Sequence, residues 1–452
     1  MTELYYPLRS LREGNWFKLI CGASFQHLPA VRNLTLAYTL AGADCIDVAA
    51  DPAVIASALD ALQVATELGE EAQVRGFGFN HRPLLMVSLN DGEDPHFRKA
   101  EFDPQLCPAG CPRPCEKICP AQAIVFPTAK PIAAGEQGRQ FTAGVSSKLS
   151  QHQSPIGSEK THDWAANPKS TPPLSRGGEN PTSIEGFSGV IDQRCYGCGR
   201  CLPICPSQII YPRSYVFAPE AIAQLILPAG VDALEIHTKV GHLTDFKRLW
   251  QAIAPWVNRL KLLAISCPDG DGLMDYLWAL HDLIMPLPCP LVWQTDGRPM
   301  SGDIGMGATR AAVKLSQKVL AARLPGYVQL AGGTNDHTVM KLRDVGLLNE
   351  QGRRNDPDQP VNHIQNPKSH VAGIAYGSYA RVLLSPILEK LEQPNGEAAD
   401  ANLISLQNPS LGCLEESPRL LWQAVETAHS LVSQLKISQR HDPNPDKTKP
   451  EH

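Results

Sequence analysis

Apolar runs and segments with helical spacing alternate along this chain. Eight of the runs are almost continuously apolar, which is typical of parallel strands covered on both faces. We predict strands over residues 17–24, 45–50, 84–89, 233–238, 262–267, 291–296, 328–333 and 371–377. Eight strands with helical crossovers predict an α/β fold, a (β/α)8 TIM-like barrel, and an open doubly wound sheet is the alternative.

Helices are expected between these strands. Apolar side chains recur at 3.6-residue spacing from Leu28 to Ala41. Asp51 can cap a helix that begins at Pro52, because Asp is a favoured N-cap residue and proline is tolerated in the first turn. Further helices with one apolar face are predicted over residues 243–260 and 414–437.

The composition narrows the class of protein. The chain has 452 residues, of which 43% are hydrophobic and 19% are charged, as in ordinary globular proteins. A net charge of −5 does not favour nucleic-acid binding. No run approaches the roughly 20 apolar residues that a membrane span needs, and the N-terminus does not read as a signal peptide. We therefore expect a protein that does not span a membrane and is located in the cytoplasm.

Some segments interrupt the alternation of strands and helices. Residues 130–186 are rich in Gly, Ser, Pro, Gln and Lys and poor in aliphatic residues, so we expect disorder there. A polar loop is expected over residues 349–370 and a loose tail over residues 441–452. The predicted organisation is a first part of the barrel (1–104), the first half of a ferredoxin-like module (105–129), the disordered insert (130–186), the second half of the module (187–215), the second part of the barrel (216–395), and a linker, helix and tail (396–452).

Eight of the thirteen cysteines form two groups of four between the third and fourth predicted strands. The second group reads Cys195-Tyr-Gly-Cys198-Gly-Arg-Cys201-Leu-Pro-Ile-Cys205-Pro206. This is the bacterial ferredoxin spacing, in which three thiolates of one tight loop bind a [4Fe–4S] cluster and the fourth binds a second cluster. Gly197 and Gly199 suit the tight turns that such a loop requires.

The first group has a wider spacing, Cys107-Pro-Ala-Gly-Cys111-Pro-Arg-Pro-Cys115-Glu-Lys-Ile-Cys119-Pro120. Zinc and a three-iron centre are the alternatives to a [4Fe–4S] cluster here. An internal repeat favours the cluster, because residues 118–124 and 204–210 share the pattern Ile-Cys-Pro-x-Gln-x-Ile.

Crossed ligation follows from the two-cluster pattern. We expect Cys107, Cys111 and Cys115 to share one cluster with Cys205. Cys195, Cys198 and Cys201 would share the other cluster with Cys119. The remaining five cysteines are expected to be buried apolar side chains; they are Cys21, Cys45, Cys267, Cys289 and Cys413.

The last two predicted strands end in glycine turns, whose free N–H groups can bind an anion. Gly332, Gly333, Gly377 and Ser378 are therefore candidates for contacts to a flavin or a phosphate-bearing ligand, although the glycines can equally serve tight turns. Residues 294–310 and three polar residues near the end of the fourth strand, His237, Lys239 and His242, are weaker candidates. Patterns of zinc hydrolases, nucleophile elbows and P-loops are absent from the sequence, so catalytic residues are unknown.

The cysteine groups, the segment Asn15-Trp16-Phe17-Lys18-Leu19-Ile20-Cys21-Gly22-Ala23-Ser24 and the turn Gly332-Gly333-Thr334-Asn335 together carry a resemblance. Over nearly its full length the chain resembles the cyanobacterial light-dependent period protein (LdpA) family, iron–sulfur proteins that modulate the circadian clock. The resemblance implies a redox-sensing input to the clock, with partners among its kinases and input proteins.

Two classes of function follow. The first is a regulatory redox sensor, in which the state of the clusters changes a surface for a partner. The second is an oxidoreductase, in which the clusters carry electrons from a redox partner to a flavin or a phosphate-bearing substrate in the barrel. The sensor is favoured, mainly because of the family resemblance.

Overall fold

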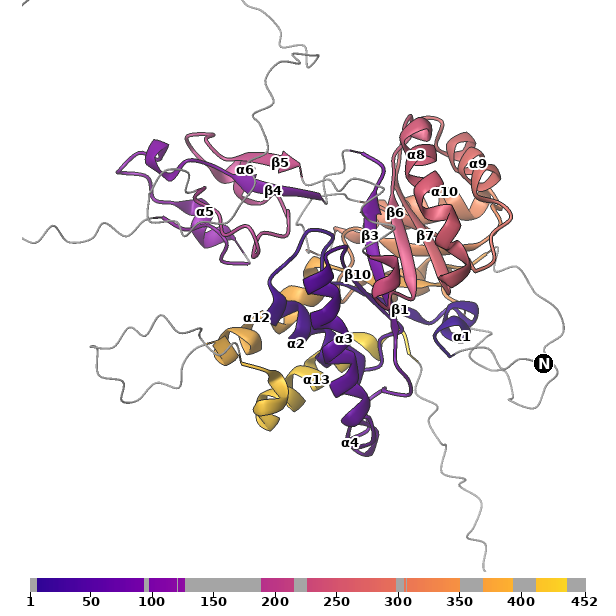
Figure 1. Ribbon diagram of the computed structural model, residues 1–452, viewed down its shortest axis with the longest axis horizontal. Coiled ribbons are helices and arrows are strands. Elements are labelled where there is room, and N and C mark those ends of the chain that lie inside the picture. Colours follow the sequence, from indigo (N-terminus) through magenta and orange to yellow (C-terminus); the bar gives the residue numbers. More distant parts are fainter. Residues whose placement is uncertain are drawn as a thin grey trace, which may run out of the picture. The chain divides into compact units, whose positions relative to one another are not determined.

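Eight parallel strands close into a barrel in the computed structural model, which describes residues 6–92, 97–119, 121–126, 188–214, 226–297, 305, 307–349, 369–392 and 412–436 (Figure 1). The barrel strands are β1 (Trp16–Ile20), β2 (Cys45–Ala49), β3 (Leu84–Asn90), β6 (Ala233–His237), β7 (Leu262–Pro268), β8 (Leu291–Asp296), β9 (Tyr327–Ala331) and β10 (Gly373–Tyr376). Each pairs with the next of these strands, and β10 closes the ring on β1. The predicted barrel is confirmed, and the doubly wound sheet is wrong.

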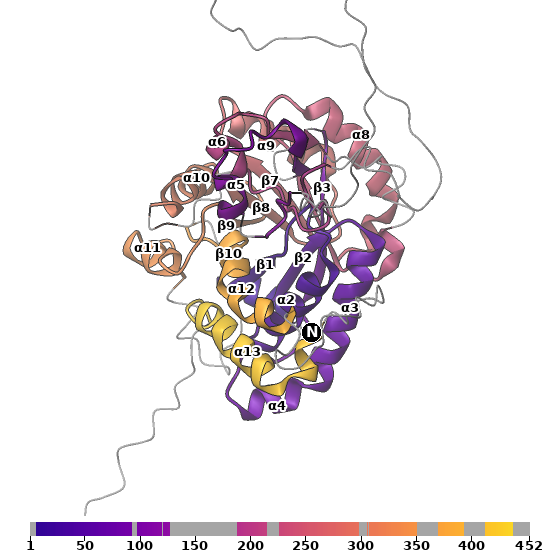
Figure 2. The ribbon, with the colours of Figure 1, turned by 90° about the vertical axis from the view of Figure 1, so that its left-hand side faces the viewer.

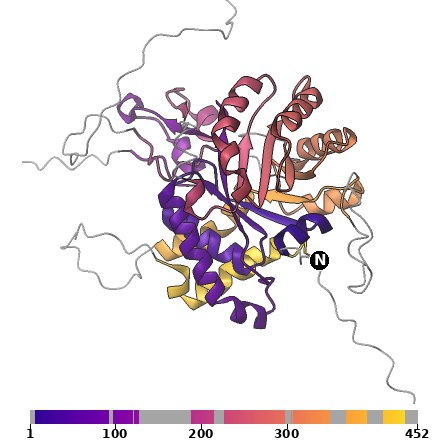
Figure 3. The same ribbon diagram turned by 45° about the vertical axis from the view of Figure 1, so that its right-hand side comes forward.

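Helices lie outside the strands, as Figures 2 and 3 show. They are α1 (Tyr6–Glu13), α2 (Leu28–Leu40), α3 (Pro52–Glu67), α4 (Gly69–Val74), α8 (Leu243–Ile253), α9 (Leu273–Ile284), α10 (Thr309–Ala321), α11 (Thr338–Asp344) and α12 (Ser378–Glu392). The predicted cap is confirmed, because Asp51 Oδ1 accepts the N–H groups of Ala53 at 2.9 Å and Val54 at 3.2 Å. The segment predicted as one helix over 243–260 changes to a 3-10 helix after α8, where Pro255 lacks the N–H that an α-helix needs.

The last helix, α13 (Pro418–Val432), begins later than predicted, after a 3-10 turn over Leu414–Glu416. Its apolar face packs against α2 and α12. Asn33 of α2 fixes the approach to this helix, because its Nδ2 donates to Gly412 O at 3.1 Å and its Oδ1 accepts the N–H of Leu414 at 3.1 Å. The C-terminal helix is thus part of the outer layer of the barrel.

The barrel has two apolar cores. The larger one fills the space between the strands and the surrounding helices, where odd-numbered residues of β1 such as Phe17 and Leu19 are buried. The smaller one fills the barrel interior near the start of the strands. It consists of Leu11, Trp16, Cys45, Leu84, Met86, Ala233, Leu262, Ala264, Val292 and Ala372. The interior nearer the ends of the strands is polar.

The cysteine-rich module lies between β3 and β6. Two strands that were not predicted, β4 (Arg98–Glu101) and β5 (Tyr211–Ser214), pair antiparallel, and two short helices, α5 (Pro114–Ile118) and α6 (Cys201–Ile204), contact each other. The strand β4 reads Arg-Lys-Ala-Glu, so it lacks the alternation that marks a strand in a sequence. The sheet joins the start of the module to its end.

Several predictions fall outside the described residues. They are the disorder of residues 130–186, the looseness of the tail 441–452 and nearly all of the polar loop 349–370. The domain boundaries drawn from the sequence also stay predictions. Within the described parts of the chain, no helix has both the length and the apolar character needed to cross a membrane.

Candidate metal centre

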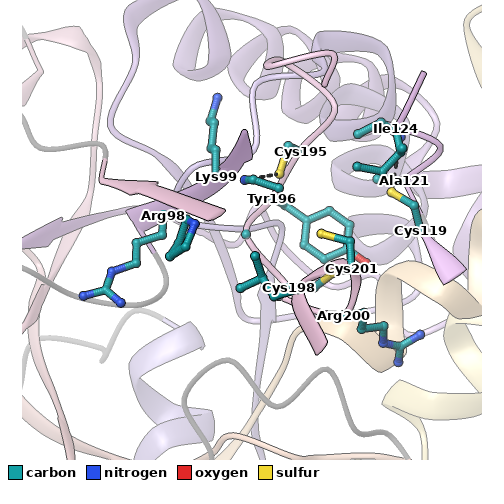
Figure 4. A pocket seen from close by; sticks show the side chains of 16 residues that line it. Arg98, Lys99, Cys119, Ala121, Ile124, Cys195, Tyr196, Cys198, Arg200 and Cys201 are labelled. Atoms are coloured by element: carbon teal, nitrogen blue, oxygen red, sulfur yellow. Dashed lines mark hydrogen bonds between the residues drawn. The ribbon is translucent and has the colours of Figure 1, made fainter. Parts of the chain in front are cut away.

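Cys119 belongs to the first cysteine group in the sequence but lies beside the second group in space. It lines one cavity together with Cys195, Cys198 and Cys201 (Figure 4). The helix α5 ends one residue earlier, and the extended backbone of Cys119 carries its side chain toward the other loop. The Cys119 thiolate lies near enough to these three thiols that its negative charge contributes to raising the pKa of each. This is the arrangement that crossed ligation requires.

The reciprocal approach joins Cys205 to the first group. Cys205 follows α6 with an extended backbone, as Cys119 follows α5. Burial raises the pKa of Cys115, and the neighbouring charge of Cys205 adds to that increase. Cys107 and Cys111 lie next to each other on the more exposed side of this group, where burial and a hydrogen bond between the two thiols raise the pKa of Cys107.

The internal repeat adopts the same backbone twice. Three residues after Cys119 and Cys205, the residues Gln122 and Gln208 take left-handed conformations with φ of 48° and 52°. Their N–H groups donate back to the carbonyl oxygens of the two cysteines, at 3.2 Å and 3.1 Å. The structure therefore supports the interpretation of the two cysteine groups as halves of one pseudo-symmetric module.

Backbone N–H groups point at several of the sulfur atoms. Ala100 N donates to Cys195 Sγ at 3.3 Å, and Ala123 N donates to Cys119 Sγ at 3.2 Å. Gly197 and Gly199 take φ of 71° and 72°, so the turns expected from the sequence are present. Hydrogen bonds of this kind stabilise thiolates and tune iron–sulfur clusters.

Burial opposes the ionisation of these thiols in the protein alone. It is the main reason that the pKa of Cys201 rises to about 12, and the charges of Cys198 and Cys195 add to the effect. A bound metal centre would have to displace the protons of such thiols, which is the ordinary coupling between metal binding and deprotonation.

The spacing of the sulfur atoms bears on the kind of centre. Among the residues that the structure describes, no three Cys, His, Asp or Glu side chains converge closely enough to hold one metal ion. The four thiols instead line a cavity whose other walls are mainly backbone and apolar side chains. A cluster of several iron and sulfide ions is larger than a zinc ion, so this donor set fits a cluster better than a single zinc ion.

Contacts beside the second cysteine group hold the module to the barrel. The ring of Tyr196, between Cys195 and Cys198 in the sequence, forms a T-shaped pair with Phe25, with ring centroids 5.6 Å apart, and lies under the guanidinium of Arg381. Arg381 in turn donates through Nη1 to the carbonyl oxygens of Ile20, at 2.8 Å, and Cys21, at 3.1 Å. The end of β1 and the start of α12 are thereby tied to the cysteine loop.

The glycine turns of the barrel are packed within the chain. Gly333 has φ of +83°, and a Cβ there would lie 2.5 Å from Ala308 O, so only glycine fits. Thr334 Oγ1 donates to Ala375 O at 2.8 Å, and Ser378 Oγ accepts a hydrogen bond from Arg381 at 3.1 Å. These partners favour the tight-turn interpretation. Contacts from Gly332, Gly333, Gly377 and Ser378 to a ligand stay a prediction.

A polar network fills the barrel interior nearer the strand ends. The sequence analysis named its members Gln294 and His237 as weaker candidates but missed Lys18, Asp47 and Glu235. Lys18 of β1 forms ion pairs with Asp47 of β2, at 2.9 Å, and with Glu235 of β6. Gln294 of β8 accepts from Lys18 at 3.1 Å and donates to Glu235 at 2.7 Å. His237 Nε2 lies 2.9 Å from Glu235 Oε1. A lysine inside an otherwise apolar strand pattern, Trp-Phe-Lys-Leu-Ile, was the available signal.

Lys18 and Glu235 stabilise each other's charge, whereas burial and the like charge of Glu235 raise the pKa of Asp47 despite Lys18. Burial alone would lower the pKa of Lys18, but the carboxylates of Asp47 and Glu235 outweigh it and raise that pKa. Burial likewise opposes the charge of Glu235, but Lys18 and His237 lower its pKa to about 2. Of the other barrel candidates, His242 lies near a carboxylate, with its Nδ1 3.5 Å from Asp91 Oδ1. Residues 298–304 of the loop after β8 lie outside the described residues.

The chain combines a (β/α)8 barrel with a pseudo-symmetric module that contains eight cysteines. This combination places it among iron–sulfur proteins built on a barrel. The family model described as the LdpA Fe-S cluster-binding domain matches residues 180–216, and that of the Light dependent period A C-terminal domain matches residues 225–434. The chain is 42% identical to Light dependent period A of Synechococcus elongatus over 432 aligned residues. The alignment covers 95% of this chain and 94% of that protein. The chain belongs to the light-dependent period A family. No solved structure matches it.

Proposed function

We propose that the module binds two [4Fe–4S] clusters with crossed ligands. One cluster would be held by Cys107, Cys111, Cys115 and Cys205, and the other by Cys195, Cys198, Cys201 and Cys119. The observation that carries this proposal is the position of Cys119 in the cavity of the second group. When bound, the clusters would accept and release single electrons, and the chain would supply the thiolates, the N–H donors and a partly buried setting.

The crossing can be tested by comparing spectra of variants of the full chain, purified without oxygen. The native protein should contain about eight iron and about eight sulfide ions per chain. The EPR spectrum of reduced Cys205→Ser should match that of Cys107→Ser, and the spectrum of Cys119→Ser should match that of Cys195→Ser. Cys289→Ser, outside the module, should leave the spectrum unchanged. Zinc beside four iron ions, or Cys205→Ser matching Cys195→Ser, would contradict the proposal.

We further propose that the clusters report the cellular redox state to the circadian clock in a light-dependent manner, as a sensor located in the cytoplasm. The family membership supports this role. The contact of Tyr196 with Arg381 also supports this role, because a conformational change of the cluster loop would displace a side chain that contacts the barrel. The partners would be kinase and input proteins of the clock.

The test of this role is the affinity of the oxidised and the reduced protein for a purified clock kinase or input protein. We expect at least a tenfold difference in dissociation constant between the two states. The variant Cys107→Ser/Cys195→Ser is the control and should bind equally under both conditions. Equal affinities of the native protein in both states would refute the sensor.

The alternative function is an oxidoreductase, and the network of Lys18, Asp47 and Glu235 is the observation that favours it. Polar groups near the strand ends of a barrel are where such enzymes hold their substrates. Flavin absorbance in the purified protein, or turnover with a reduced ferredoxin and an acceptor, would support the enzyme. An iron–sulfur spectrum without an organic cofactor would favour the sensor.

A further inference from the structure

Lys99 is a fully enclosed cation next to the cavity of the second cysteine group. It lies on β4, where its neighbours Arg98 and Ala100 are half-buried, whereas Lys99 itself is only 1% exposed. Lysine is almost never buried unless its charge has partners. A short strand with no apolar pattern thus places its one buried charge inside the module.

The partners of the Lys99 ammonium come from two other parts of the chain. Nζ donates to the carbonyl oxygen of Asp192 at 2.9 Å, to Asp192 Oδ2 at 2.8 Å, and to Gln26 Oε1 at 2.7 Å. Asp192 lies three residues before Cys195, and Gln26 lies in the loop between β1 and α2. The other oxygen of Asp192 accepts a hydrogen bond from Arg213 at 2.6 Å.

The backbone next to Lys99 contacts the sulfur of Cys195. The next residue, Ala100, donates its N–H to that sulfur at 3.3 Å, and Lys99 lines the same cavity. Burial raises the pKa of Cys195, and the charge of Lys99 acts in the opposite direction. In Figure 4 the backbone of Lys99 lies beside Cys195, and its ammonium extends away from the sulfur atoms, as does the guanidinium of Arg98 in another direction.

The effect of this charge depends on screening. Water and salt screen an exposed charge strongly but a buried charge weakly. The counterion does not cancel Lys99 fully, because the side chain of Asp192 is 43% exposed and is shared with Arg213. A positive charge near a cluster favours the state with the extra electron. We propose that Lys99 raises the reduction potential of the cluster held by Cys195, an inference that rests on the proposed two-cluster function.

The test is a potentiometric titration of the full anaerobic protein, followed by EPR. In Lys99→Met one of the two reduction potentials should decrease by at least about 59 mV. For a one-electron step this equals a tenfold change in the ratio of oxidised to reduced cluster. The other step should stay in place as an internal reference. Lys99→Arg should restore the native value, because it keeps the charge.

Asp192→Asn separates an electrostatic role from a structural one. It removes the negative partner, so the same step should move to higher potential, opposite in direction to Lys99→Met. Arg98→Gln, on the same strand but half-exposed, is the matched control and should shift the step by less than a factor of three. Shifts of Lys99→Met and Asp192→Asn in the same direction, or shifts under threefold with both clusters retained, would overturn the inference. Absence of any cluster in the native protein would instead overturn the proposed function.

Discussion

The guanidinium carbon of Arg381 lies 4.1 Å from the centroid of the Tyr196 ring. Tyr196 belongs to the proposed cluster loop and Arg381 to the last helix that follows a barrel strand, so one contact joins two parts of the chain that are distant in sequence. Arg381 is 9% exposed, and a desolvated cation–π pair of this kind contributes up to about 2 kcal/mol.

Removing this contact should loosen the module without removing cluster ligands. We expect a double-mutant cycle of Tyr196→Leu and Arg381→Met, measured by urea unfolding of the cluster-loaded protein, to give a coupling of about 1–2 kcal/mol. Tyr196→Phe keeps the ring and should behave nearly as the native protein. Coupling indistinguishable from zero would mean that the two residues only lie near each other.

Breaking the network inside the barrel should be costly. Lys18→Met leaves Asp47 and Glu235 buried without their cation, and removing one partner of a buried ion pair costs about 3–5 kcal/mol. The comparison is Lys318→Met, which removes an exposed ion pair to Asp269 and should change the unfolding free energy by less than about 1 kcal/mol. Urea unfolding midpoints of the two variants measure the difference. Similar midpoints would contradict a stabilising role of the network.

Stability should fall as the pH is lowered from neutral. Burial and the nearby charge of Lys436 lower the pKa of His81 to about 4, below its ordinary value of 6.5. The unfolded chain therefore binds a proton at this site more readily than the folded chain, and stability is lost as the pH falls from about 6.5 to 4.

The measurement is the urea midpoint of the native protein and of His81→Gln at pH 7, 6 and 5. We expect the native midpoint to decrease more steeply than that of the variant, which lacks the titrating ring. Both proteins carry the same cysteines, so acid damage to the clusters affects both alike. Parallel decreases would show that His81 does not contribute.

Loss of Asn33 should release the C-terminal helix first. Asn33→Ala leaves the buried Leu414 N and the half-buried Gly412 O without their partner, and the buried group alone costs about 1–3 kcal/mol. Hydrogen exchange should rise in α13 before it rises in β1 or β2. Thr427→Ala, an exposed substitution within α13 itself, is the control and should leave exchange near the native pattern. Uniform acceleration across the barrel would indicate global destabilisation instead.

Repetition made the barrel predictable from sequence. Each strand is an apolar run that is buried on both faces, so the signal recurs eight times and the closure follows. The cysteine groups were visible for a similar reason, because ligand spacing along the chain is local. The pairing of β4 with β5 and the burial of Lys99 were not visible, because both depend on contacts between segments far apart in sequence.

The interior network was also not predictable from the sequence, because it too depends on contacts between distant segments. Lys18, Asp47 and Glu235 stand on three different strands and become partners only when the barrel closes. The late start of α13 reflects a local rule, proline at the first position of the helix, that weighs more than the apolar pattern before it.

The place of Cys119 among cysteines that come much later in the chain has a consequence for biosynthesis. When only the first group has been translated, the cavity has one of its four thiols, and the remaining three emerge far downstream. A chain truncated before Cys195 cannot complete it. A metal centre could therefore fill this cavity only after both halves of the module have been synthesised and have come together. It would then cross-link two segments of the chain that are far apart in sequence.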